Sequence, residues 1–302
     1  MNYRELPDIT DRQKEIVKLI YQYRFINRKQ LQRLFNHKDT RRINTWLRDL
    51  VTKNYLGRIY SKKLLENTKP AIYFLNNNGI IWVRYNMGSE YSSDESERLD
   101  FKHLRKFYED KHASLTFINH CITIFEFYLQ LKEVEKVTSK NISKGGKKKL
   151  EYHTETKTEM WITRQLYLVG NEDFSEIKQY IPDLFIEQIR NVDRKDESSS
   201  NYFLELFDPH MPKYAIRYRI KTYIKLKEEG PWEDFMNWTI KFPTIILIFP
   251  HHRKMNSVVQ YIRDELLRSF ESKDIRFLLT TYQKATTKGL TDPTIYQEIK
   301  EE

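Results

Sequence analysis

The chain has 302 residues, of which 31% are charged, and its 52 basic and 42 acidic residues give a formal net charge of +10. This length suffices for two domains, while a mean hydropathy of −0.72 and apolar runs far shorter than about 18 residues exclude a membrane-spanning helix. The single cysteine, Cys121, excludes an intrachain disulfide, and the first residues lack a signal-peptide pattern. We therefore expect a cytoplasmic protein without a membrane partner.

Three short amphipathic helices are predicted in the N-terminal segment. Thr10 with Gln13 and Asn27 with Gln30 have the spacing of capping boxes, and Asp39 is a suitable N-cap for the third helix. Apolar residues then recur at intervals of three and four, which predicts one buried face on each helix. The inward positions are Ile16, Leu19, Ile20 and Tyr23 in the first helix, Leu31, Leu34 and Phe35 in the second, and Ile43, Leu47 and Leu50 in the third.

Two strand-like runs follow at residues 55–61 and 71–75, and the polar segment 62–70 between them is typical of a β-hairpin turn. Helices followed by a hairpin are the parts of a winged helix-turn-helix domain, which we expect over residues 1–86. Such a domain places one recognition helix in the major groove of DNA. The third helix is the candidate for that role.

The outward face of the third helix carries side chains suited to phosphate oxygens and base edges. An ordinary solvated basic face would have a similar composition, but the position of this helix after two others favours binding to double-stranded DNA. Lys62 and Lys63, in the segment between the two strands, could likewise reach the phosphate backbone or could lie in a solvated loop. The candidate DNA-binding residues are Arg28, Lys29, Lys38, Arg41, Arg42, Asn44, Thr45, Arg48, Lys62 and Lys63.

The positive charge is concentrated in this same segment. Residues 1–63 contain 16 basic and 6 acidic residues, and residues 64–302 contain 36 of each. The whole basic excess therefore lies in the helical segment and hairpin. Binding to phosphate through counterion release requires such a local concentration of cations.

A Ser/Glu-rich segment at 87–101 is predicted to be a linker to a second domain at 102–285, and residues 286–302 are predicted to be a flexible tail. The Gly/Lys-rich segment 140–149 is typical of a hairpin tip or loop. The expected order of helices and strands indicates a mixed sheet with helices on both faces, as in restriction-endonuclease-like folds. The expected helices are 104–131, 213–227 and 257–270, and the expected strands are 160–169, 180–189, 202–207, 242–249 and 275–281.

Two acidic residues of this second domain lie on neighbouring predicted strands. Asp183 follows Pro182 at the start of one strand, and Glu205 lies in the next. Converging carboxylates can hold Mg²⁺ for phosphodiester hydrolysis, and Glu126 on the preceding helix is a candidate third ligand. These residues are therefore candidates for a metal site.

The nuclease signature Pro-Asp, then Asp or Glu, any residue and Lys is incomplete in this chain. Phe207 occupies the lysine position and cannot activate water, although Lys221 on the following helix could substitute. If the site is active, its catalytic residues are Asp183, Glu205 and Lys221. The alternative is a degenerate site whose carboxylates make only structural hydrogen bonds and which needs no cofactor.

Short motifs along most of the chain match a known family pattern. They are Tyr23-Arg24-Phe25-Ile26 with Gln30-Leu31, His112-x-x-Leu115-x-x-x-Asn119, Pro182-Asp183, Phe203-Leu204-Glu205, and Ile220 with Tyr223. In these motifs the chain resembles the replication-relaxation family of plasmids and mobile elements. The family tends to have lysine where this chain has Arg219, and often an acid where it has Phe207. The resemblance implies a DNA-binding protein of replication or DNA processing, with a nuclease-like second domain.

Three functions remain open from the sequence. The first is a DNA-binding replication protein that uses its second domain for assembly or DNA contact. Other replication proteins are possible partners of such a protein. The second is a Mg²⁺-dependent nuclease or nickase, and the third is a transcriptional repressor. The missing lysine at Phe207 favours the first function over the second. One recognition helix covers a short site, so we also expect a homodimer or repeated binding sites.

Overall fold

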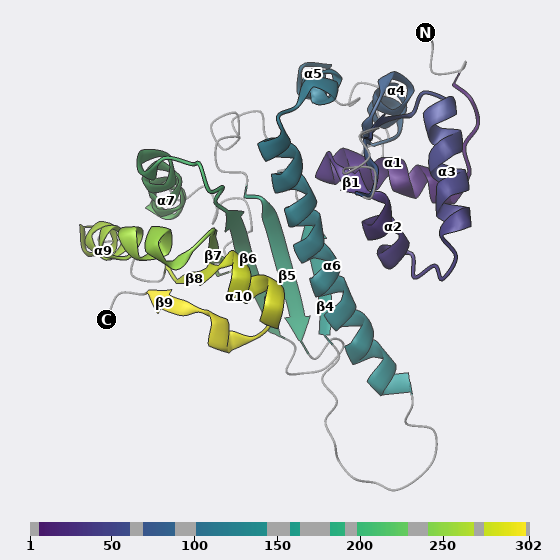
Figure 1. Ribbon diagram of the computed structural model, residues 1–302. Helices are drawn as coiled ribbons and strands as arrows, with labels where there is room; N and C mark the ends of the chain where they lie inside the picture. The colour runs from purple at the N-terminus through teal and green to yellow at the C-terminus, as the bar shows by residue number, and fades with distance from the viewer. Residues whose placement is uncertain are drawn as a thin grey trace, which may run out of the picture. The chain divides into compact units, whose positions relative to one another are not determined.

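The computed structural model describes residues 6–60, 69–87, 101–143, 158–163, 182–190, 198–228, 241–268 and 275–299 (Figure 1). By their contacts, residues divide into two compact units, Met1–Leu129 (unit 1) and Gln130–Glu302 (unit 2). The described residues form a mixed α and β structure with one sheet in each unit. The expected linker, apart from its two end residues, lies outside the described residues, as do Lys62, Lys63 and the segment 144–149.

Unit 1 combines helices with a three-stranded antiparallel sheet in the order β1-β3-β2. Strands β2 and β3 pair from Leu56 opposite Leu75 to Ile59 opposite Ile72. The elements are α1 (Asp11–Tyr23), β1 (Ile26–Asn27), α2 (Arg28–Leu34), α3 (Thr40–Thr52), β2 (Leu56–Ile59), β3 (Ile72–Leu75), α4 (Asn77–Asn86), α5 (Phe101–Tyr108), the 3-10 turn η3 (Asp110–His112) and the first part of α6 (Leu115–Ser143).

The predicted caps of the first three helices and the inward faces of the first and third are confirmed. The backbone amide of Thr10 donates to Gln13 Oε1 at 2.9 Å, and that of Gln30 donates to Asn27 Oδ1 at 3.0 Å, so both capping boxes form. Asp39 caps α3 by accepting from the amide of Arg41 at 2.8 Å. The inward residues of α1 and α3 are buried, whereas Leu34 and Phe35 at the end of α2 are only half-buried.

The single helix predicted over residues 104–131 is wrong. The chain instead forms α5, a 3-10 turn ending at His112, and then α6, because the Ser114 hydroxyl and carbonyl start a new helix by accepting from the amides of Phe117 and Ile118. His112 is exposed and Leu115 is 73% exposed, so neither is a core residue. Neither α6 nor any other helix in the described ranges is long and apolar enough to cross a membrane.

The first part of α6 belongs to unit 1 because it packs on the N-terminal helices. The Tyr23 and Phe125 rings meet edge to face with centroids 4.8 Å apart, and Gln30 Nε2 donates to the carbonyl of Ile122 at 2.8 Å. Unit 1 therefore extends beyond residue 86, the predicted end of the first domain.

Gly79 allows α4 to approach the start of β2 closely. A Cβ atom placed at this residue would lie 2.3 Å from the backbone carbonyl oxygen of Tyr55. Alanine in a helix is normally favoured over glycine by about 1 kcal/mol. Here we expect Gly79→Ala to destabilise the protein by about 1–3 kcal/mol, because a backbone atom must move. Chemical denaturation would measure this loss, and an unchanged or raised stability would contradict the close approach.

Unit 2 contains a six-stranded mixed sheet in the order β4-β5-β6-β7-β8-β9. The pairs β4-β5, β5-β6 and β8-β9 are antiparallel, whereas β6-β7 and β7-β8 are parallel. The elements are β4 (Thr158–Thr163), β5 (Leu184–Arg190), β6 (Ser198–Leu206), α7 (Lys213–Glu228), β7 (Thr244–Phe249), α9 (His252–Arg268), β8 (Phe277–Thr281), α10 (Tyr282–Lys288), the 3-10 turn η6 (Pro293–Ile295) and β9 (Gln297–Ile299).

The crossover helices α7 and α9 lie side by side on one face of the sheet (Figure 1). Ile220 of α7 and Ile262 of α9 share one buried cluster with Leu247 of β7. The expectation that such helices cover both faces is therefore not met by this pair. Two successive right-handed crossovers in the same direction along a sheet place their helices on the same face.

The expectation of a loose tail from Thr286 is also wrong as far as residue 299. Strand β9 extends the sheet by pairing with β8, with Ile299 opposite Phe277. Ile295 and Ile299 are buried, and Thr280 Oγ1 donates to the carbonyl of Ile295 at 3.0 Å. Short apolar anchors of this kind give no periodic signal in the sequence.

Candidate functional site

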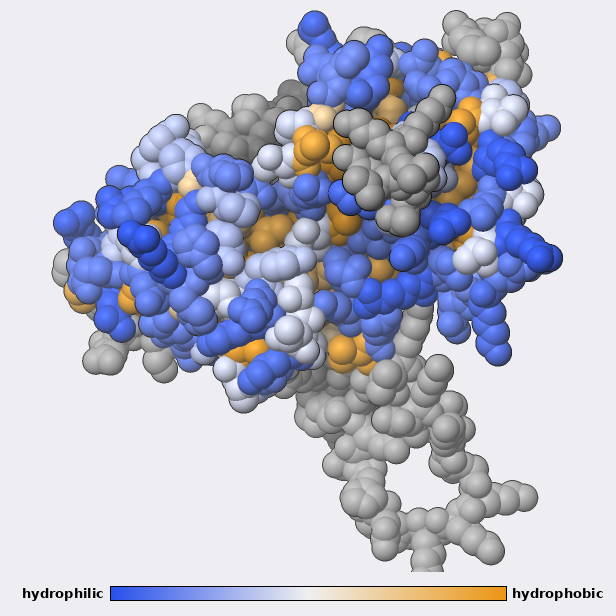
Figure 2. Space-filling model, in the orientation of Figure 1, coloured by the Kyte–Doolittle hydropathy of each residue, from blue (hydrophilic) through white to orange (hydrophobic). Residues whose placement is uncertain are grey.

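The outward face of α3 presents cationic side chains to solvent. Arg41, Arg42 and Arg48 are exposed, while Ile43 and Leu47 on the opposite face are fully buried. Hydrophilic side chains cover the outer surface of α3, at the right of Figure 2. The arginines can therefore contact a ligand while Ile43 and Leu47 remain buried in the core.

The other predicted residues of this face have different surroundings. Thr45 is exposed, but its hydroxyl already donates to the carbonyl of Arg41 at 3.0 Å. Asn44 is half-buried and faces Arg28. Lys29 and Lys38 are both exposed.

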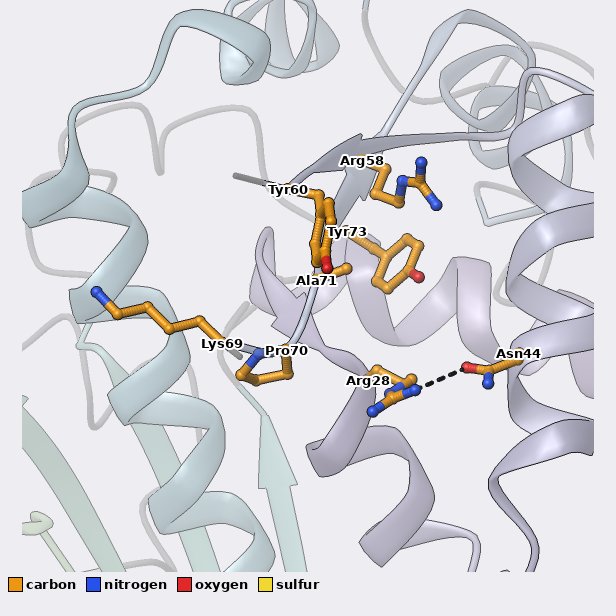
Figure 3. A pocket seen from close by; sticks show the side chains of 8 residues that line it. All are labelled: Arg28, Asn44, Arg58, Tyr60, Lys69, Pro70, Ala71 and Tyr73. Carbon is orange, nitrogen blue, oxygen red and sulfur yellow. Dashed lines mark hydrogen bonds between the residues drawn. The ribbon is translucent and has the colours of Figure 1, made fainter. Parts of the chain in front are cut away.

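A hollow of about 220 Å³ lies between α2, α3 and the strands β2 and β3 (Figure 3). Arg28 Nη1 donates to Asn44 Oδ1 at 3.3 Å across it, while the Nε atom of Arg28 is buried and has no hydrogen-bond partner among the described residues. Figure 3 shows the Lys69 side chain extending away from the two arginines, at the rim. The lining residues are Arg28, Asn44, Arg58, Tyr60, Lys69, Pro70, Ala71 and Tyr73.

The charge of this hollow suits an anion. Three of its lining residues are cationic, at Arg28, Arg58 and Lys69, and none of the eight is acidic. Burial raises the pKa of the Tyr73 hydroxyl, and the positive charges of Arg58 and Arg28 oppose that rise only in part. Tyr73 thus remains a neutral donor beside the arginines. A phosphate oxygen is the ligand that such a set of donors recognises.

Arg58, Lys69 and Tyr73 line this hollow but were not predicted from the sequence. The alternation along β2 would have suggested Arg58, which is exposed between the buried Gly57 and the half-buried Ile59. The pairing of β2 with β3 then brings Arg58 opposite Tyr73. The amino-acid sequence between β2 and β3 does not indicate the register in which the two strands pair.

In unit 2 the structure brings Asp183 and Glu205 together as expected. Asp183 precedes Leu184, which pairs with Leu204, so the two acids lie on neighbouring strands. Asp183 Oδ2 accepts from the backbone amide of Leu206 at 2.9 Å. The two carboxylates are close enough for the charge of Asp183 to raise the pKa of Glu205.

Both oxygens of the Glu205 carboxylate are engaged by side chains of α7. Arg219 Nε donates to Oε1 at 2.8 Å, and the Tyr223 hydroxyl donates to Oε2 at 2.6 Å. The Arg219 guanidinium also lies over the Tyr223 ring, 5.4 Å from its centroid. Glu205 is only 7% exposed, so this network joins β6 to α7 inside the unit.

The electrostatics of this network agree with a structural role. Burial is the largest cause that raises the pKa of Glu205, and Arg219 and Tyr223 oppose it. Burial lowers the pKa of the Arg219 guanidinium, but the carboxylate of Glu205 and its other neighbours raise that pKa by more, so Arg219 stays charged. Burial and the Glu205 charge raise the pKa of Tyr223 well above its usual range, so it remains a proton donor.

The other predicted catalytic and metal residues are not assembled around Glu205. Lys221 is exposed on α7, and Arg219 holds the position against Glu205 that Lys221 was expected to take. Phe207 is buried against Phe249, with ring centroids 5.0 Å apart.

Glu126 has partners within unit 1, where it forms an ion pair with Arg33 and accepts from Gln30 Nε2 at 3.4 Å. Among the described residues, no group of three or more histidine, cysteine or acidic side chains could hold a metal ion.

Comparisons with known proteins give one match. A family model described as replication-relaxation matches residues 17–238, which include the whole of α2, α3, β6 and α7. No curated protein and no solved structure shows a significant match to the chain. The match spans both the cationic surface of unit 1 and the Glu205 network of unit 2.

Proposed function

Since the chain belongs to the replication-relaxation family, we propose that it binds double-stranded DNA through a winged helix in unit 1 and acts in replication or DNA processing. The observation that carries this proposal is the cationic outer face of α3 beside an acid-free hollow. Its partners are duplex DNA and other proteins of replication. A symmetric pair of chains would read two half-sites, as one recognition helix covers only a few base pairs.

The order of elements in unit 1 supports the winged-helix assignment. Helix α1, strand β1, helices α2 and α3, and then the antiparallel pair β2-β3 follow one another along the chain. In this arrangement α3 is the recognition helix, and strands β2 and β3 belong to the wing. The hollow at Arg28 and Arg58 then lies where the wing meets the recognition helix and can receive a backbone phosphate.

For unit 2 we propose a restriction-endonuclease-like fold used for assembly or DNA contact. The strand order and the position of Glu205 on β6 support the fold assignment. The occupied carboxylate oxygens of Glu205 and the buried Phe207 favour a use other than cleavage.

Gel mobility shift with duplex fragments and supercoiled plasmid, with and without Mg²⁺, tests both parts of the proposal. We expect shifted duplex whose affinity falls steeply with salt, because each phosphate contact releases condensed counterions. Absence of any shift at low salt would refute DNA binding. Mg²⁺-dependent nicking that disappears in Asp183→Ala and Glu205→Ala chains would instead establish the nuclease.

The hollow itself gives a further prediction. Replacing Arg28 or Arg58 with alanine should weaken duplex binding by about tenfold each, as expected for the loss of one charged contact. Each change should also lower the log–log salt slope by about 0.9. Lys14→Ala is a matched control, because Lys14 lies in unit 1 and pairs with Asp11 at 2.9 Å. Equal affinity for the Arg28, Arg58 and Lys14 variants would exclude a phosphate from the hollow.

A further inference from the structure

Helix α7 carries an exposed line of aromatic and basic side chains. Tyr214 is 76% exposed and Tyr218 is 65% exposed, whereas Tyr223 on the inward face of the same helix is fully buried. Lys221 and Lys225 continue the line and are also exposed. The spacings of four, three and four residues place all four side chains on one stripe, about 16 Å long at 1.5 Å per residue.

The inward face of the same helix is fixed in place. Arg219 and Tyr223 project towards the sheet and are bound by Glu205, while Ile216 and Ile220 are buried in the core. The orientation of α7 about its axis is therefore set by a charged network as well as by apolar contacts. The aromatic and basic stripe consequently faces solvent as a rigid surface.

The charge of α7 contrasts with its surroundings. Residues 64–302 contain equal numbers of basic and acidic residues, yet α7 contains six basic residues and one acid, Glu228, at its end. Of the six, only Arg219 is used against Glu205. Arg217 lies beside the stripe, with its guanidinium 5.0 Å from the centroid of the Tyr261 ring. The stripe therefore presents positive charge without an acidic residue between Lys213 and Lys227.

We propose that this stripe of α7, formed by Tyr214, Tyr218, Lys221 and Lys225, is a second nucleic-acid site that binds single-stranded DNA. The two rings, one helical turn apart, stack on unpaired bases, and the two lysines neutralise phosphates further along the strand. The site lies in unit 2, is separate from α3, and does not depend on duplex binding by unit 1.

Single-stranded DNA fits this surface better than a duplex does. In a duplex the base faces are stacked inside the helix, so exposed tyrosine rings would meet only the backbone, whereas an unpaired strand offers base faces and phosphates together. An acidic protein would pair with the same lysines, and polyglutamate is the probe for that partner.

Fluorescence anisotropy with a labelled oligothymidylate of about 20 nucleotides, which exceeds the site size of one such module, tests the proposal. The full-length chain carries Arg41→Ala, Arg42→Ala and Arg48→Ala so that α3 does not contribute. In this background Tyr214→Ala with Tyr218→Ala should weaken binding by about 25-fold or more, at about fivefold or more for each stacked ring. Tyr214→Phe with Tyr218→Phe is the matched control, and we expect it to stay within about twofold because both rings remain.

The lysines are tested separately. Lys221→Gln with Lys225→Gln should lower the log–log salt slope for the oligonucleotide by about 1.4, or about 0.7 per phosphate of a single strand. All four residues are exposed, so thermal unfolding should be unchanged and serves as the folding check.

Three results would overturn the proposal: no oligonucleotide binding by the α3-substituted chain, equal binding by the alanine and phenylalanine pairs, or binding of polyglutamate in place of the oligonucleotide. If the chain with an intact α3 does not bind duplex DNA, that result contradicts the proposed function but not the single-strand site on α7.

Discussion

Replacing Arg41, Arg42 and Arg48 with alanine is expected to remove most of the affinity for duplex DNA while leaving unit 1 folded. The three side chains are exposed on α3, and the residues that hold the helix in place, Ile43 and Leu47, lie on its opposite face. At roughly tenfold for each charged contact, the loss is about a thousandfold at moderate salt. The log–log salt slope should fall by up to about 2.7, or about 0.9 for each phosphate contact.

A charge-matched variant separates recognition from overall charge. A variant with Arg276→Ala, Lys284→Ala and Lys288→Ala removes the same number of positive charges, but from unit 2. We expect it to change duplex affinity by less than about threefold. Circular dichroism and thermal unfolding establish that both variants are folded. If the two triple variants lose affinity equally, net charge and not α3 determines binding, and the winged-helix proposal fails.

The sequence predicted α3 and its outward arginines because the relevant signals are local. A cap at Asp39 and apolar residues at Ile43, Leu47 and Leu50 determine both the start of the helix and the face it buries. Once those are known, the exposed positions follow from helical geometry. The same reasoning correctly placed the capping boxes of α1 and α2.

Features that depend on pairing between distant segments were not predictable in this way. Arg58 joins the hollow only because β2 pairs with β3, and β9 joins the sheet only because Ile299 meets Phe277. The single helix predicted over residues 104–131 failed for another reason, since Ser114 caps a new helix within that range. Local periodicity contains no information about such contacts.

The Pro-Asp and Glu motifs predicted that Asp183 and Glu205 converge, but they did not predict which side chains of α7 bind Glu205. Asp183 and Glu205 converge as the Pro-Asp and Glu motifs suggested, yet the cation beside Glu205 is Arg219. The signal available in the sequence was the spacing of Arg219 and Tyr223, four residues apart on one face of a helix with apolar neighbours. A polar pair on an inward face needs a buried partner, and Glu205 is that partner.

Glu205→Leu is accordingly expected to lower the free energy of unfolding by about 3 kcal/mol, in addition to any effect on DNA. The substitution leaves the Arg219 guanidinium, whose side chain is only 20% exposed, without its carboxylate. It also removes the acceptor of the Tyr223 hydroxyl. Breaking a buried ion pair by removing one partner costs about 3–5 kcal/mol, and the partial exposure of Arg219 places this case near the lower limit. Urea denaturation measures the loss.

The double variant Glu205→Leu with Arg219→Met should recover most of that stability, because replacing a buried pair with apolar groups of similar volume is often nearly neutral. Asp183→Asn, by contrast, should cost less than Glu205→Leu, since its amide oxygen can still accept from the amide of Leu206. In a metal-dependent nuclease both carboxylates would be required for DNA cleavage. Cleavage would then be lost in Glu205→Leu and would not return in the double variant. Recovery of stability in the double variant would therefore show that the loss in Glu205→Leu comes from leaving the buried Arg219 without its carboxylate. A double variant less stable than Glu205→Leu alone would show that Arg219 has another partner.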